Sequence, residues 1–318
     1  MEVILTSGSG TDTANRILAE RQAGAYAVDL MPTGSTTANR RMIPAGALDP
    51  FEPLLIHPEV TDKSLWFGGR YWWGDPEQKY IFIHGAEATQ WTPTVWFNTD
   101  LVSQAEIEAI RVPADLFNPK WRGKVVVIPP DFGGAGGSYY SAYLNDDAGP
   151  EWIRTLLIEM EPFFSTDYRV MTDGIAQGKF HLGILIGRAG RDLQSLQDKG
   201  QTNIAELTQA LSAVPELTAS GSSPLMMVAN RPKNPAATQL FVNWFLSREG
   251  QMAVHELSTD ADQSLREDIP PGNINPSYLR QPGLEYQFPD ADPVLLARFD
   301  EALKFAVDVY REAQGSGG

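Results

Sequence analysis

The chain has 318 residues and a formal net charge of −15, which argues against a nucleic-acid partner because neutralising phosphates needs clustered Lys and Arg. Its 42% hydrophobic and 20% charged residues are typical of a globular protein long enough for two domains. It contains no cysteine, which excludes disulfides and thiolate chemistry and fits an exported protein. No apolar stretch is long enough to span a bilayer, and the residues after Met1 lack the pattern of a signal peptide.

The amino-terminal region predicts two short strands, each followed by a polar loop that contains glycine. Residues 2–6 form the first strand candidate, and a helix with apolar residues at helical spacing follows its loop. Residues 26–31 form the second strand candidate. Such loops suggest an open α/β sheet, in which ligands bind at the carboxyl ends of the strands. The candidate ligand-binding residues of these loops are Ser7, Gly8, Ser9, Thr33, Gly34 and Ser35.

The densest aromatic segment covers residues 65–85. Asp75 and Pro76 indicate a turn within it, so the segment predicts two strands joined as a hairpin. Its aromatic rings have two interpretations, a ligand cage or a packed domain core, and the core is favoured because large rings mainly supply buried area. The rings belong to Trp66, Phe67, Tyr71, Trp72 and Trp73. His84 has no partner at metal-ligand spacing and is interpreted as a structural histidine.

Residues 124–143 predict a strand, a ligand loop and the start of a helix. The β-branched run 125–128 has the composition of a buried parallel strand. The glycines that follow let the backbone turn sharply and approach a ligand, and Ser138 stands at a helix start, where free N–H groups favour anions. These glycines are Gly133, Gly134, Gly136 and Gly137. The alternative is a glycine-rich turn that binds nothing.

The rest of the chain continues the alternation of strands and helices. Strands are predicted over 94–97, 180–186 and 224–229, and helices over 101–110, 151–160, 170–177, 192–211, 235–246 and 293–311. The motifs of serine hydrolases, zinc proteases, P-loop NTPases and dinucleotide enzymes are all absent. We therefore assign no catalytic residue, no metal site and no cofactor.

Four segments, taken in order, carry a family resemblance. They are WRGKVVVIPPDFGGAGGSYYSAYL at 121–144, GPEWIRTLL at 149–157, TDYRVMTDGIAQGKFHLGILIG at 166–187 and PLMMVANRPKNPAATQLFVNWFLSREGQ at 224–251. This order resembles the bacterial periplasmic solute-binding proteins of ABC importers, the group that includes the ferric-ion-binding proteins. The resemblance extends over about residues 3–257.

The resemblance implies an α/β fold of the type 2 periplasmic binding proteins. Two open sheets flanked by helices would form two lobes, joined by two hinge crossings near 92–97 and 206–213. Lobe 1 would comprise 1–93 and 210–314, lobe 2 would comprise 94–209, and 315–318 would be a linker remnant. Residues 3–31 resemble the family's second strand and helix, so the first strand-helix unit is expected to be missing.

The resemblance also implies where a ligand binds and what it is. The position of the iron-binding tyrosine pair of the ferric members falls on Arg188 and Ala189. An arginine would repel a ferric ion but offers bidentate hydrogen bonds to a carboxylate or phosphate. We therefore expect a small anionic organic ligand or an oxyanion. Besides the amino-terminal loops, the expected ligand-binding residues are Trp91 (with Trp66, Tyr71 or Trp72), Gly136, Gly137, Ser138, Tyr168, Arg169 and Arg188.

Two alternatives stay open. The first is an importer component that binds ferric or another metal ion through Tyr139, Tyr140 or Tyr168. The second is a two-lobed transferase or lyase, which would need a buried carboxylate or histidine with a perturbed pKa beside the ligand. The favoured expectation is a monomeric, non-enzymatic periplasmic protein whose partners are an anionic small molecule and an ABC permease in the inner membrane.

Overall fold

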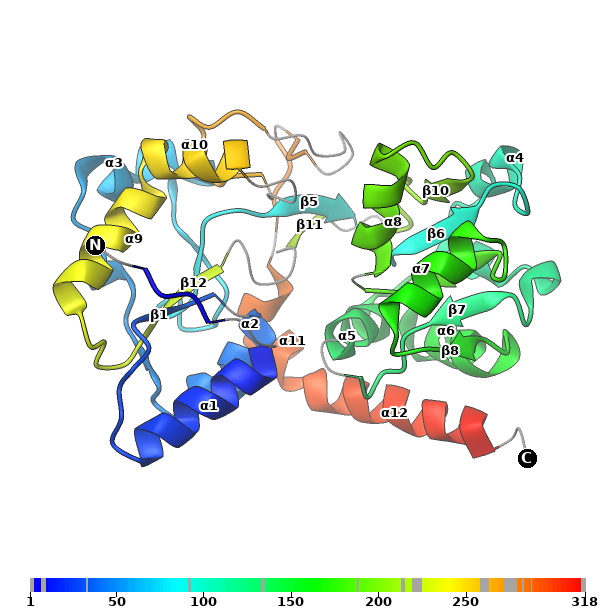
Figure 1. The fold of residues 1–318 in the computed structure, drawn as a ribbon, viewed down its shortest axis with the longest axis horizontal. Helices are drawn as coiled ribbons and strands as arrows, with labels where there is room; N and C mark the ends of the chain where they lie inside the picture. Colours follow the sequence, from blue (N-terminus) through cyan, green and yellow to red (C-terminus); the bar gives the residue numbers. More distant parts are fainter. Residues whose placement is uncertain are drawn as a thin grey trace. The chain divides into compact units, whose positions relative to one another are not determined.

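The computed structural model divides the chain into two compact units (Figure 1). Unit 1 comprises residues 1–89 and 215–296, and unit 2 comprises residues 90–214 and 297–318, so the chain passes between the units three times. The structure describes residues 3–6, 10–32, 34–90, 93–132, 135–187, 189–212, 215–218, 225–257, 263–271, 279–281, 283–286 and 288–315.

Unit 1 contains a five-stranded sheet built around one buried strand, β12. The order is β1-β12-β4-β3, β2 also pairs with β12, and every pairing is antiparallel. All five residues of β12 are buried, as its unbroken apolar sequence predicts. The strands are β1 (Leu30–Met31), β2 (Leu48–Asp49), β3 (Trp72–Trp73), β4 (Phe82–Ile83) and β12 (Leu225–Ala229).

The predicted hairpin is confirmed, because Trp72 pairs with Ile83 and Trp73 with Phe82. Asp75 holds its turn together. The buried carboxylate accepts backbone N–H bonds from Lys79 (3.0 Å), Tyr80 (3.0 Å) and Ile81 (2.8 Å). Burial raises the pKa of Asp75, although these hydrogen bonds oppose the shift.

The aromatic rings of the hairpin region form the core of unit 1, and the core interpretation is confirmed. Trp66 is fully buried and packs edge-on against Phe82 with ring centroids 5.2 Å apart. Its indole N–H and the Tyr71 hydroxyl both donate to the carbonyl of Val60, at 3.0 and 2.9 Å. Trp72 donates to a backbone carbonyl as well. The burial of Trp66, Tyr71 and Trp72 and the internal hydrogen bonds of their polar atoms thus favour a packing role over a ligand-covering one.

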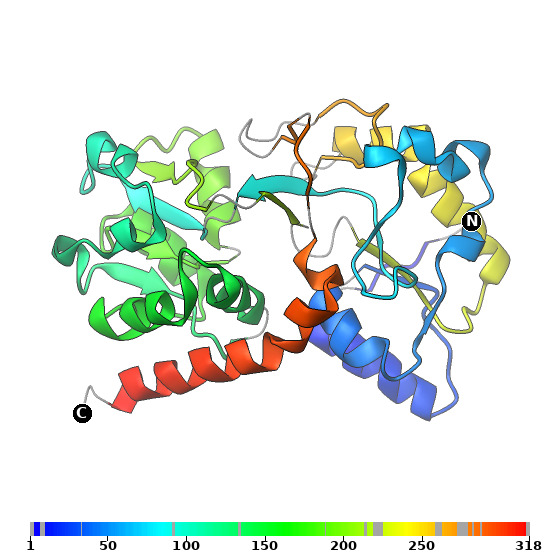
Figure 2. The same ribbon diagram turned by 180° about the vertical axis from the view of Figure 1, so that it is seen from behind.

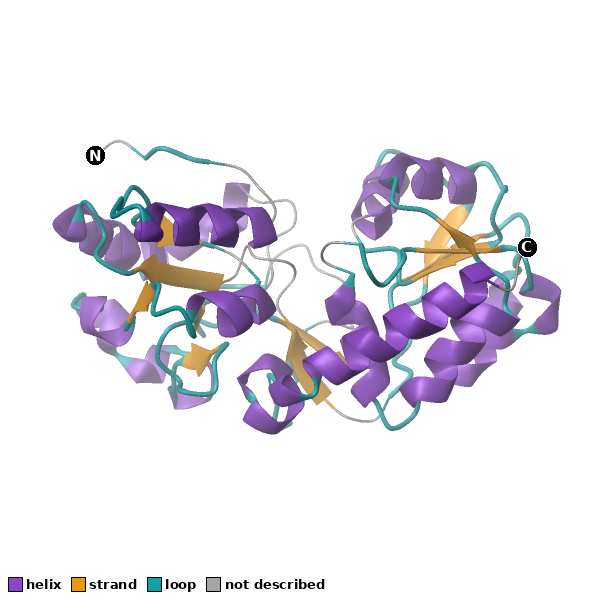
Figure 3. Ribbon diagram, turned by 90° about the horizontal axis from the view of Figure 1, so that it is seen from below, coloured by secondary structure: helices purple, strands orange, loops and turns teal. Residues whose placement is uncertain are grey.

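The helices of unit 1 flank its sheet, and Figure 3 shows strands with helices around them in each unit. α1 buries Ala14 and Ile17, and α9 buries Val242 and Leu246, at the helical spacing the sequence predicts. The short α2 continues directly into a π-helical turn, Ala38–Met42. The helices are α1 (Gly10–Gln22), α2 (Ser35–Thr37), α3 (Pro58–Thr61), α9 (Pro235–Leu246) and α10 (Arg248–Leu257).

Unit 2 contains a mixed five-stranded sheet in the order β10-β6-β9-β7-β8. β9, β7 and β8 run parallel, whereas β6 is antiparallel to both of its neighbours. β7 and β9 are buried throughout, as expected for parallel strands covered on both faces. The strands are β6 (Val95–Asn98), β7 (Val125–Val127), β8 (Phe163–Phe164), β9 (Leu182–Ile184) and β10 (Ile204–Glu206).

The last helix of the chain, α12, packs on unit 2 and runs along its helices (red in Figure 2). Ala306 and Val309 lie in the core of unit 2. We expected lobe 1 to extend to residue 314, so the chain differs from that expectation after residue 296. The helices of unit 2 are α4 (Gln104–Glu108), α5 (Gly136–Leu144), α6 (Gly149–Arg154), α7 (Tyr168–Ala176), α8 (Ala189–Asp198) and α12 (Phe299–Gly315). The short helix α11 (Pro293–Ala297) contains the last passage of the chain between the units.

Two strands flank the first two passages and pair with each other. They are β5 (Glu87–Gln90) and β11 (Pro215–Thr218), which form a separate two-stranded sheet. The chain passes between the units at 89/90 and 214/215, and the hinge crossings expected near 92–97 and 206–213 stay a prediction.

Three predicted elements differ from the structure, and the first is the helix predicted over 293–311, which is divided at residue 298 into α11 and α12. Residues 3–6 form no strand, and Ile4 and Leu5 are 83% and 88% exposed, because no described strand pairs with them. The helix predicted over 192–211 ends at Asp198, because Gly200 takes a φ of +100° that a helix cannot continue through. Within the described residues, no helix has the length and apolar character that a membrane span requires.

Candidate functional site

The helices α5, α7 and α8 begin at one edge of the unit 2 sheet. β7, β8 and β9 are parallel neighbours, and each is followed in the chain by one of these helices. Because the carboxyl ends of parallel strands meet at one edge, the three strand-to-helix loops lie there together. Apart from Trp91, the residues predicted to bind ligand in unit 2 belong to these loops and to the helix starts that follow them.

Tyr168 brings the loops into contact. Its ring lies 6.1 Å from that of Phe132, in the loop after β7. A Cβ built on Gly187 would lie 3.9 Å from Cε1 of Tyr168 and 2.9 Å from Cδ1 of Ile128, so glycine is favoured at this position, where φ is +54°. The half-buried Tyr168 therefore packs beside the residue that precedes Arg188.

The start of α7 already has an internal carboxylate. The side chain of Asp167 accepts backbone N–H bonds from Arg169 at 2.8 Å and Val170 at 3.4 Å. This N-cap satisfies amides that an anionic ligand would otherwise use. The Arg169 side chain is exposed, and its guanidinium forms no ion pair within the described part of the chain.

Two glycines at the start of α5, Gly136 and Gly137, look equivalent in the sequence but have different surroundings in the structure. A Cβ on Gly136 would lie 3.3 Å from Cδ1 of Leu303 and 3.4 Å from Cζ of Phe299, whereas a Cβ on Gly137 would meet nothing within 4 Å. Gly136 thus permits close packing of α12, and this packing explains the absence of a side chain at this position without a ligand. The N–H of Ser138 donates to the carbonyl of Ala135 at 3.0 Å.

In unit 1 the predicted loop Gly34–Ser35 lies against a carboxylate far away in the chain. Ser35 Oγ and Thr36 Oγ1 both donate to Oδ2 of Asp290, at 2.5 and 3.0 Å. Asn39 donates to the backbone carbonyls of Gly74 at 2.7 Å and Asp290 at 3.3 Å, which fixes the segment that carries Asp290. Figure 1 draws α2 beside the segment that leads into α11.

Asp290 has no cationic partner within the described residues. Burial raises its pKa, and the hydrogen bonds from Ser35 and Thr36 act in the opposite direction. A half-buried carboxylate held by two hydroxyls and no cation is an unusual arrangement, because charges removed from water are normally paired. The sequence analysis missed Thr36, Asn39 and Asp290, and no local motif marks Asp290, which lies in a proline-rich stretch.

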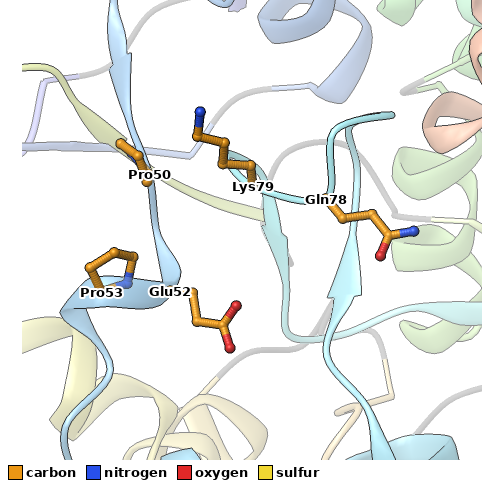
Figure 4. Close-up of a pocket in the computed structure, with 5 residues that line it drawn as sticks. All are labelled: Pro50, Glu52, Pro53, Gln78 and Lys79. Carbon is orange, nitrogen blue, oxygen red and sulfur yellow. The ribbon is translucent and has the colours of Figure 1, made fainter.

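A surface hollow in unit 1 contains none of these groups (Figure 4). Its charged residues have nearby partners, since Glu52 pairs with Lys63 and Lys79 with Glu77. We therefore do not assign it to the ligand. It is lined by Pro50, Glu52, Pro53, Gln78 and Lys79.

Tyr139, one of the tyrosines named as a possible metal ligand, lies in the core of unit 2. The hydroxyl of Tyr139 is fully buried and donates to the carbonyl of Ile128 at 2.7 Å. Burial raises the pKa of Tyr139 strongly, which disfavours the phenolate that a ferric ion needs. No group of three or more acidic or histidine ligands is found within the described residues.

Several predicted ligand-binding residues lie outside the described residues, so their geometry is not part of the site described above. They are Ser7, Gly8, Ser9, Thr33, Trp91 and Arg188.

Two α/β units, each with a sheet flanked by helices, define the architecture of a type 2 periplasmic binding protein. Residues 2–252 match the family model described as bacterial extracellular solute-binding protein, and the chain belongs to this family. It is therefore the solute-binding component of a bacterial ABC importer, with a small-molecule ligand and an ABC permease as its partners. The family is extracellular or periplasmic and consists of binding proteins rather than enzymes.

Solved structures share the fold at low sequence identity. Iron-bound HitA from Pseudomonas aeruginosa is 18% identical, with 97% of this chain and 90% of that chain covered and a TM-score of 0.61. FutA from Trichodesmium, in complex with iron and citrate, is 15% identical over 97% and 90%, with a TM-score of 0.65. AfuA from Actinobacillus pleuropneumoniae, with fructose-6-phosphate bound, is 15% identical over 95% and 88%, with a TM-score of 0.64. Comparison with curated proteins gives no match.

Proposed function

We propose that this solute-binding protein captures a small solute through an oxyanion group, a carboxylate or a phosphate, and delivers it to its permease. The closure of two hinged lobes on the ligand, which the family resemblance implies, is part of this proposal. The paired strands β5 and β11 are the proposed hinge, because they flank two of the passages between the units.

One observation carries the proposal: two hydroxyls of a predicted ligand loop converge on a single carboxylate oxygen. Ser35 Oγ and Thr36 Oγ1 donate to the same Oδ2 of Asp290. Hydrogen bonds to an ionised acceptor are stronger than those between neutral groups. A donor pair that suits an internal carboxylate also suits the oxyanion of a solute.

Unit 2 supplies a second set of donors. The helix starts of α5 and α8 follow parallel neighbouring strands, and Arg169 presents a guanidinium without an ion pair in the described structure. Arg188, between β9 and α8, would add bidentate recognition. Of the structurally similar proteins, AfuA is solved with a sugar phosphate and FutA with iron and citrate, so oxyanion ligands fit this fold.

Titration calorimetry tests the proposal, with inorganic phosphate and citrate as probes and ferric ion as the metal alternative. We expect at least one oxyanion to bind and Arg188→Ala to weaken it by about tenfold to a hundredfold, the value of a hydrogen bond to a charged group. Binding of ferric ion alone, without either oxyanion, would overturn the oxyanion assignment.

A further inference from the structure

We propose that Asp290 is a specificity-determining residue: its carboxylate is a resident occupant of the oxyanion position on Ser35 and Thr36, which an incoming solute must displace. The inference rests on the proposed function. It makes the Asp290 carboxylate a competitor of the solute for the hydroxyls of Ser35 and Thr36. It follows from the two hydroxyl contacts at 2.5 and 3.0 Å, which leave neither hydroxyl proton for another acceptor.

The contact can open without unfolding the segment that carries Asp290. Phe288 is 9% exposed and belongs to the core of unit 1, which anchors the segment two residues before Asp290. Asn39 binds the backbone carbonyl of Asp290 rather than its side chain. A turn of the side chain can therefore release both hydroxyls while the backbone keeps its place.

Few interactions hold the Asp290 carboxylate in its contact with Ser35 and Thr36. This half-buried carboxylate lacks a cationic partner in the described structure, so among the described side chains only the two hydroxyls offset the cost of its partial burial. A solute oxyanion that also contacts cationic groups would be held by more interactions than Asp290 is. We infer that Asp290 screens out weak single-contact anions and admits solutes that bring further contacts.

The expected change in affinity follows from the fraction of molecules in which the hydroxyls of Ser35 and Thr36 are free. The apparent Kd equals the intrinsic Kd divided by the fraction of molecules in which the hydroxyls are free. If Asp290 occupies them in about nine molecules of ten or more, the apparent Kd is weakened at least about tenfold. Removing the charge should recover this factor.

The experiment compares Asp290→Asn with Asp292→Asn in the full chain. Both remove one negative charge, but the exposed Asp292 caps α11 through the N–H groups of Val294 and Leu295 and does not touch the hydroxyl pair. An Asn at 292 can still cap the helix. Binding of inorganic phosphate is measured by calorimetry, and thermal unfolding checks that each variant is folded.

We expect Asp290→Asn to bind phosphate at least about tenfold more tightly than the unmodified chain, and Asp292→Asn to change affinity by less than about twofold because an exposed charge is screened. In the Asp290→Asn background, Ser35→Ala with Thr36→Ala should remove the gain. Equal phosphate affinity in the unmodified chain and Asp290→Asn would overturn the inference and leave the proposed function standing. Weaker binding in Asp290→Asn would make Asp290 a positioning residue instead and also overturn it. Failure of phosphate and citrate to bind any of these proteins would overturn both.

Discussion

Gly136 packs directly against Leu303: a Cβ on the glycine would lie 3.3 Å from Cδ1 of the leucine. The two residues lie in α5 and α12, so this contact joins the last helix of the chain to the glycine-rich loop of unit 2. Phe299 approaches the same glycine at 3.4 Å from its Cζ. A glycine that looks like part of a ligand loop in the sequence is therefore also a packing residue.

The substitutions Gly136→Ala and Gly137→Ala should change the free energy of unfolding by different amounts or in opposite directions. Replacing a helical glycine by alanine without strain stabilises a protein by about 0.4–1 kcal/mol, and nothing lies within 4 Å of a Cβ at Gly137. At Gly136 the new methyl group must push Leu303 or Phe299 aside. Urea unfolding should therefore give Gly137→Ala the higher free energy of unfolding.

Leu303→Ala provides the control for this pair. It removes the side chain that Gly136→Ala would strain, so the two changes should be less destabilising together than the sum of their separate effects. Strict additivity, or a larger gain from Gly136→Ala than from Gly137→Ala, would contradict the packing role of Gly136.

Phe299→Ala should destabilise the protein by about 3–5 kcal/mol, the usual cost of removing a buried ring. Phe299 is 5% exposed and its ring centroid lies 5.0 Å from that of Tyr140. Lys304→Ala is the matched control on the same helix, because its pair with Asp308 is exposed to solvent and its removal should change stability far less. Similar losses for the two variants in thermal or urea unfolding would argue against α12 as part of the unit 2 core.

The final helix illustrates what the sequence can and cannot predict about the fold. The apolar spacing of residues 299–309 correctly predicts an amphipathic helix with one buried side. Spacing does not say which sheet or helix covers that side, and the helix packs on unit 2 rather than in the lobe where we expected it. The hairpin was predictable because its pairing is local and Asp75 with Pro76 indicates the turn.

Arg266→Met should destabilise unit 1 by about 3 kcal/mol, because removing one partner of a buried ion pair leaves polar groups without partners. The side chain of Arg266 is fully buried and binds Asp268 through Nε (2.8 Å) and Nη2 (2.7 Å). It also donates to the carbonyls of Glu59 and Leu246. The measurement is the urea dependence of unfolding.

Arg266→Lys tests whether charge alone suffices at this position. An ammonium group lacks the planar fork that reaches Asp268 and two carbonyls at once, so we expect lysine to recover little of the loss. A lysine variant as stable as the unmodified chain would show that the bidentate geometry contributes nothing.

The stability difference between Asp290→Asn and the unmodified chain should depend on pH. Burial raises the folded-state pKa of Asp290 above its ordinary 3.8. Between these two values the folded protein binds more protons than the unfolded one, so Asp290 contributes stability that is full below pH 3.8 and is lost as pH rises through the folded-state pKa.

We therefore expect the free energy of unfolding of Asp290→Asn, minus that of the unmodified chain, to increase as pH rises above 3.8 and then level off. Urea unfolding of both proteins across this range checks the sign. A difference that is constant with pH, or that falls as pH rises, would mean that the carboxylate is not held in the environment described.

The candidate site was only partly predictable for a physical reason. Glycine and hydroxyl residues after strands predicted that Ser35 binds an anionic ligand, since loops at strand ends have free polar groups; ligand binding by Ser35 stays a prediction. The anion in the structure is the carboxylate of Asp290, 255 residues further along the chain, and no local pattern predicts a pairing over that distance. For the same reason, the sequence could not distinguish a Gly136 that faces a ligand from one that faces Leu303.

Native mass spectrometry of freshly purified protein tests the oxyanion assignment most directly. We predict a non-covalent adduct with the mass of an anionic small molecule, lost on denaturation and absent from the variant with Ser35→Ala and Thr36→Ala, whose hydroxyls converge on Asp290 in the structure. An adduct of iron alone, or a small-molecule adduct that the double variant retains in full, would contradict the role assigned to these hydroxyls.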